Sequence, residues 1–114
     1  MSATIGLPTF GALQEAAGEE FVAELARTFL EEAPRMIEQL IVAMAGNDAE
    51  KFRRTAHSLK SNSLTFGATR LGELARQLEV AGLERVIADD AAALETLGLE
   101  YRRVATALQE LIHA

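Results

Sequence analysis

Apolar residues recur at steps of three and four along most of this chain, and this spacing constrains the fold more than any other feature. Near the C-terminus the series steps 3, 4, 3, 4 and 3 through Leu94, Leu97, Tyr101, Val104, Leu108 and Leu111. Such steps return to one face of an α-helix, which has about 3.6 residues per turn. No stretch alternates apolar and polar residues as a half-buried strand does. The spacing therefore predicts an all-α fold.

Turn-forming residues divide the periodic stretches into separate helices. We expect an irregular lead-in over residues 1–8, and then a short helix that Pro8 and Thr9 open and Gly18 ends. Longer helices are predicted at Glu19–Ala45, Ala49–Phe66, Ala68–Ala81 and from Asp89 or Asp90 to the C-terminus. Amphipathic helices joined by short turns predict an antiparallel four-helix bundle with a short extra N-terminal helix. At 114 residues the chain fits one domain over residues 1–114.

Pro34 lies inside the first long helix. Proline has no backbone N–H and its ring crowds the preceding turn, so we expect a kink or a break there.

Charge and cysteine content exclude several classes of function. A formal net charge of -6 argues against nucleic-acid binding, which needs cations to replace phosphate counterions. The absence of cysteine excludes thiolate metal sites, disulfides and cysteine nucleophiles. The longest apolar run, Leu40–Ala45, falls short of the roughly 20 residues that cross a bilayer. We therefore expect a cytoplasmic protein with neither a nucleic-acid nor a membrane partner.

The residue best suited to chemistry is His57, in the middle of the predicted helix 49–66. It follows the buried-face position Ala56, so it lies about 100° around the helix from that face, at its edge or in solvent. Its neighbours three and four residues away are Arg53, Arg54, Lys60 and Ser61. Nearby cations disfavour a protonated imidazole and stabilise negative charge that arrives on the ring. The other histidine, His113, is expected to be an exposed tail residue.

The charge is unevenly distributed around this histidine. Residues 49–76 hold six basic residues and two acidic ones, a net charge of +4, whereas the rest of the chain has a net charge of -10. From composition alone, this segment also fits a solvated helix face, and His57 also fits a histidine that fills a niche near the core. No glycine-rich phosphate loop and no HExxH arrangement is present, so we expect no metal, no cofactor and no ATP site of its own.

The residues around His57 resemble the signature of histidine phosphotransfer (HPt) domains. Residues 56–68 read AHSLKSNSLTFGA, against a family pattern of approximately A-H-x-L-K-G-x-(S/A)-x-x-(L/V/F)-G-A. The stretches at 29–34 (FLEEAP) and 71–79 also fit, so the likeness extends from about Phe21 to Ala81. The motif is specific, because the histidine, the lysine three residues later and the glycine ten residues later occur together.

The resemblance implies a role for each matching residue. His57 would be the phosphoacceptor, and Lys60 would offset the charge of the phosphoryl group. Ser61 stands where the family usually has a glycine beside the site. Gly67 would form the turn to the next helix. Glu79 stands where some relatives have a glutamine that bonds the imidazole, and it would hold the ring N–H or face solvent. Arg53 and Arg54 would add positive charge.

The family also implies the partners. The protein would be a phosphocarrier rather than an enzyme. It would be a monomer that relays a phosphoryl group between aspartates of receiver domains, those of response regulators or of a hybrid sensor histidine kinase. The receiver would supply the Mg²⁺, and an apolar rim near Leu64 would dock it. Two alternatives stay open: the histidine-bearing domain of a chemotaxis-type kinase, and a non-catalytic helical interaction module.

Overall fold

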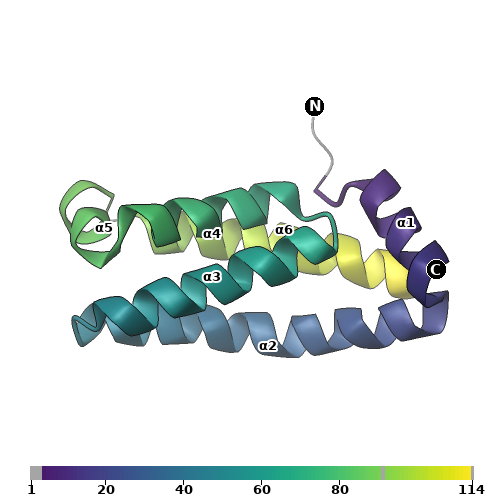
Figure 1. Cartoon of the computed structure of the whole chain (residues 1–114), viewed down its shortest axis with the longest axis horizontal. Helices are drawn as coiled ribbons and strands as arrows, with labels where there is room; N and C mark the ends of the chain where they lie inside the picture. Colours follow the sequence, from purple (N-terminus) through teal and green to yellow (C-terminus); the bar gives the residue numbers. More distant parts are fainter. Residues whose placement is uncertain (1–3, 91, 114) are drawn as a thin grey trace.

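The computed structural model describes residues 4–90 and 92–113, and all regular structure in that part of the chain is α-helical (Figure 1). The helices are α1 (Leu7–Ala17), α2 (Glu19–Ala45), α3 (Ala49–Thr65), α4 (Thr69–Ala81), α5 (Leu83–Asp89) and α6 (Ala93–His113). The prediction of an all-α fold is confirmed.

The four long helices α2, α3, α4 and α6 form an antiparallel bundle. Helix α3 packs against α2 and α4, and α6 packs against the same two helices from the other side. The turns at 46–48 and 66–68 are short, so each connected pair must run antiparallel. In Figure 1, α1 lies at the end of the bundle that holds the α3–α4 turn, and α5 lies at the opposite end. The predicted bundle with a short N-terminal helix is thus confirmed.

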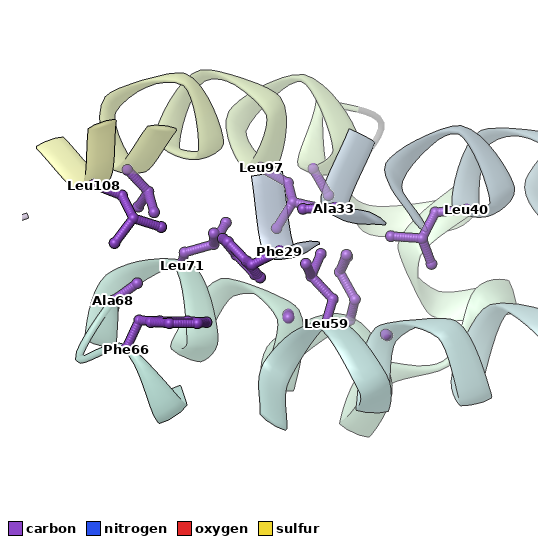
Figure 2. Close-up of a cluster of buried hydrophobic side chains, with 14 of the residues drawn as sticks. Phe29, Ala33, Leu40, Leu59, Phe66, Ala68, Leu71, Leu97 and Leu108 are labelled. Atoms are coloured by element: carbon purple, nitrogen blue, oxygen red, sulfur yellow. The ribbon is translucent and has the colours of Figure 1, made fainter. Parts of the chain in front are cut away.

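The predicted apolar faces form the core. Figure 2 shows side chains from α2, α3, α4 and α6 that point into one interior, among them Phe29, Leu40, Leu59, Leu71, Leu97 and Leu108. Burying each such side chain is worth about 1.5–3 kcal/mol. In the C-terminal series Leu97, Val104 and Leu108 are fully buried, and the other three members pack against the core from its edge.

Several helix boundaries differ from the predictions. Helix α5 was not predicted, because its seven residues are too few to show a period; it directs Leu83 and Val86 into the core. Helix α6 begins at Ala93, since Asp90 ends α5. The predicted lead-in is also too long: α1 begins at Leu7, and residues 1–3 of the lead-in lie outside the described residues, as does the last residue of the predicted C-terminal helix.

The remaining lead-in is tied to the α3–α4 turn. The N–H of Gly6 donates to the carbonyl oxygen of Gly67 at 2.8 Å, and Ile5 beside it is buried. Gly67 has φ of 79°, and a Cβ atom at this position would lie 2.9 Å from the carbonyl oxygen of Gly6. The turn therefore requires glycine for its backbone conformation and for the close approach of the N-terminal segment.

Pro34 does not break α2, which continues from Glu19 to Ala45. A residue with an N–H at position 34 would donate to the carbonyl of Leu30, one turn earlier. The hydroxyl of Tyr101 on α6 donates to this carbonyl at 3.2 Å instead. The Tyr101 ring also packs beside Phe29, with 6.2 Å between ring centroids. Of the two expected outcomes, a kink or a break, the break is wrong, because a side chain from another helix satisfies the carbonyl that proline leaves open.

We expect Tyr101→Phe to lower the free energy of unfolding by about 1 kcal/mol, because it keeps the ring but leaves the Leu30 carbonyl without its donor. In a Pro34→Ala background the N–H of residue 34 takes that carbonyl, so the same change should cost less. Urea unfolding of the wild type, the two single variants and the double variant measures the cost of Tyr101→Phe in each background. Equal costs in the two backgrounds would contradict this explanation of Pro34.

Candidate functional site

His57 faces outward because of the residues around it on α3. One face of α3 is buried in the core, and its residues include Phe52, Ala56, Leu59 and Ser63. The buried hydroxyl of Ser63 donates to the carbonyl of Leu59 at 2.7 Å, so this polar group is satisfied within the helix. His57 lies beside that face, and 54% of its side chain is exposed. Its ring is therefore accessible to a partner.

One carboxylate on α4 contacts both His57 and Lys60. Glu79 Oε2 lies 2.7 Å from Nδ1 of His57, and Glu79 Oε1 lies 2.9 Å from Nζ of Lys60. The side chain of Glu79 is 17% exposed and that of Lys60 23% exposed, so both lie largely within the α3–α4 groove. From the sequence, Glu79 was expected either to bond the imidazole N–H or to face solvent. In the structure it contacts the imidazole.

The close approach of α3 and α4 puts Glu79 within hydrogen-bonding distance of His57 and Lys60. Gly72 precedes Glu79 by seven residues, about two turns, so both lie on the same face of α4. A Cβ atom at Gly72 would lie 2.6 Å from a methyl carbon of Leu64, which follows His57 by the same two turns. Because the helices are antiparallel, contact between Leu64 and Gly72 brings His57 opposite Glu79. Sequence reasoning missed Gly72, although a glycine at a buried position of a helix is itself a sign of close packing.

The surroundings of Glu79 favour its ionised form. The hydrogen bond from Lys60 lowers the pKa of the Glu79 carboxyl below its ordinary value, and the bond to His57 lowers it further. An ionised carboxylate only accepts hydrogen bonds, so Nδ1 of His57 must carry the proton in this contact. In the neutral ring the lone pair is then on Nε2, the ring nitrogen that Glu79 does not contact.

The two arginines near His57 are engaged with another acid. Arg53 Nη2 lies 2.7 Å from Glu50 Oε1, and Arg54 Nε lies 3.8 Å from the same oxygen. Among the described residues neither arginine makes an ion pair or hydrogen bond with His57. The charge of Glu79 nevertheless contributes to raising the pKa of Arg53, after the larger effect of its hydrogen bond with Glu50. The sequence tally counted Glu50 but did not pair it with the two arginines, and it did not place Glu79 on Lys60.

The other predicted residues lie further from the ring. Ser61 is exposed one turn after His57, so a small residue does border the site. Gly67 lies beyond the end of α3 and acts on the turn rather than on the ring. His113 is exposed in the last turn of α6.

Grooves between α2 and α3 flank the site. One groove beside His57 is lined by Met36, Gln39, Lys51, Arg54, Thr55 and Ser58. A second groove has an apolar floor that includes Leu25, Phe29 and Phe66, with Glu32 at its edge. In the described part of the chain, no three acidic or histidine side chains converge as a metal site would require. No helix in the described ranges is long and apolar enough to cross a membrane.

The comparisons with known proteins agree with this geometry. The family model described as "Hpt domain" matches residues 24–114. The crystal structure of histidine-containing phosphotransfer protein B (HptB) from Pseudomonas aeruginosa PAO1 is similar, with a TM-score of 0.88 and 25% sequence identity. The match covers 99% of this chain and 97% of that one. A search of curated proteins gave no match.

The family match includes α3 and α4 in full, and with them His57, Lys60 and Glu79. Helix α1 precedes the matched residues, but the similarity to HptB extends over nearly the whole chain. Because the match covers most of the sequence, this chain belongs to the Hpt domain family.

Proposed function

We propose that the protein is a phosphocarrier of a two-component phosphorelay, in which His57 takes a phosphoryl group from one receiver-domain aspartate and passes it to another. The observation that supports this most strongly is the exposed ring whose Nδ1 is held by Glu79 at 2.7 Å. In the neutral ring this contact leaves the lone pair on Nε2, where a partner can reach it. The family membership and the similarity to HptB support the same function.

The transfer requires no group from this chain other than the imidazole and its neighbours. Nε2 of His57 attacks phosphorus as the bond between phosphorus and the aspartate oxygen breaks, and the aspartate carboxylate takes the bonding electrons. Nδ1 keeps its proton, so the ring becomes a cation beside Glu79. In the second step a new aspartate carboxylate attacks phosphorus and the ring leaves as a neutral imidazole. A covalent intermediate divides one transfer into two easier ones.

Lys60 is the cation best placed to accompany the phosphoryl group. It lies one turn after His57 on the same side of α3, and its ammonium group is held at the site by Glu79. Phosphoryl transfer depends mainly on positioning and on charge neutralisation. We infer that Lys60 supplies part of this neutralisation and that the receiver domain brings the Mg²⁺. The carrier itself then needs no cofactor, and it is not an enzyme in the classical sense.

The partner surface that we propose lies over α2 and α3 next to His57. It combines the basic groove at Lys51 and Arg54 with the groove whose floor is apolar. Leu64, which is 45% exposed, adds an apolar contact along the same helix. Such a surface suits a receiver domain from a response regulator or a hybrid sensor kinase. We further propose that the protein acts as a monomer in the cytoplasm.

We expect a phosphorylated receiver domain to transfer an acid-labile, alkali-stable label to the wild-type protein. His57→Gln should abolish this label, because it removes the nucleophilic nitrogen, whereas His113→Gln should keep it. Radiolabelled transfer followed by acid and alkali treatment measures the outcome. Label that survives His57→Gln, or no label on the wild type from any of several receivers, would sink the proposal.

We expect Lys60→Ala to slow transfer to His57 by about tenfold, the effect of removing roughly 1.4 kcal/mol of transition-state stabilisation. The helical circular-dichroism signal should stay unchanged, because Lys60 is not part of the core. Single-turnover kinetics with a phosphorylated receiver measure the rate. An unchanged rate would remove Lys60 from the mechanism.

A further inference from the structure

Lys60 is already in an ion pair with Glu79 before any phosphoryl group arrives. Its ammonium lies 2.9 Å from Glu79 Oε1, while the other oxygen of the same carboxylate holds Nδ1 of His57. The three side chains form a single cluster across α3 and α4. With a neutral ring, this cluster has one positive and one negative charge, so its net charge is zero.

A phosphoryl group on Nε2 changes this balance. At neutral pH a phosphoryl group brings a charge of about -1.5 to -2. This charge would arrive beside the ionised carboxylate of Glu79. Both anionic groups would then compete for an ion pair with the ammonium of Lys60. Arg53 is paired outside this cluster, with its guanidinium 2.7 Å from Glu50. The protonated ring offsets one unit of this charge and pairs with Glu79, but the ammonium of Lys60 stays divided between the carboxylate and the phosphoryl group. Through Lys60, Glu79 therefore acts against the phosphorylated state even as it orients the ring for phosphorylation.

We propose that Glu79 competes with the phosphoryl group for Lys60 and thereby shortens the lifetime of phosphorylated His57. This inference rests on the proposed function and adds a regulatory property to the same site. Glu79 is a positioning residue here, since it acts through Lys60 and through the ring. A neutral glutamine of the same size would still accept the Nδ1 hydrogen bond, but it would leave Lys60 to the phosphoryl group. The carboxylate thus favours rapid transfer over storage of the phosphoryl group.

The test uses the purified protein without a partner. Phosphoramidate transfers its phosphoryl group to a ring nitrogen and releases ammonia, so in a His113→Gln background it loads His57 chemically. After the reagent is removed, ³¹P NMR follows the decay of the phosphohistidine signal. We expect Glu79→Gln to lengthen the lifetime about threefold, which is the effect of a partly exposed charge pair. Glu73→Gln is the matched control, because Glu73 lies on the same helix and pairs with Arg76 at 2.8 Å instead; it should leave the lifetime unchanged.

The role of Lys60 is tested with a double-mutant cycle. Direct repulsion between Glu79 and the phosphoryl group acts whether or not Lys60 is present, whereas competition requires its ammonium group. Glu79→Gln should therefore lengthen the lifetime less in a Lys60→Ala background than in the wild type. In a Lys60→Arg background, which keeps the charge, the larger effect should return. An equal effect with Lys60→Ala, or no lengthening by Glu79→Gln alone, would overturn the inference.

This experiment separates the inference from the proposed function. Failure of the proposed function would appear as absent transfer between a receiver and wild-type His57. Failure of the inference would appear as an unchanged lifetime of chemically loaded His57 in the Glu79 variants, even if relay from a receiver is normal.

Discussion

The bridge that Glu79 makes between α3 and α4 is the interaction on which the site depends. One carboxylate fixes the proton on His57 and holds the ammonium of Lys60, and it does so from a second helix. The orientation of the His57 ring is therefore a property of helix packing rather than of α3 alone. Any change in the spacing of the two helices changes the hydrogen bond that keeps Nε2 free. This dependence explains why the fold and the chemistry of this chain cannot be separated.

The packing that supports this bridge rests on two glycines and a short turn. Gly72 lets α4 approach Leu64 closely, and Gly67 adopts the positive φ that returns the chain between the helices. The N-terminal segment strengthens the turn, because Gly6 bonds to Gly67 and Ile5 is buried beside it. At the other side of the bundle, Tyr101 compensates for Pro34 and keeps α2 continuous. These contacts fix the packing of the helices that carry His57 and Glu79.

Much of this architecture could be predicted from the sequence. The steps of three and four predicted the all-α bundle and its buried faces, since they report directly on which side of a helix is apolar. The position of His57 on the edge of such a face followed from the same geometry. The sequence could not show that Tyr101 reaches Leu30 or that Glu79 holds Lys60 as well as the ring, because these contacts join residues distant along the chain. Charge counting around His57 was incomplete for the same reason: the contact between Glu79 and Lys60 exists only when α3 and α4 are assembled.

The central claim is that Glu79 holds the Nδ1 proton of His57 and leaves Nε2 as the nucleophile. Nitrogen-15 NMR of the ring in the unphosphorylated protein at neutral pH tests this claim most directly. The account predicts a protonated Nδ1 and an unprotonated Nε2 for His57. A ring with its proton on Nε2, or one that exchanges freely between both tautomers as an exposed histidine does, would contradict it.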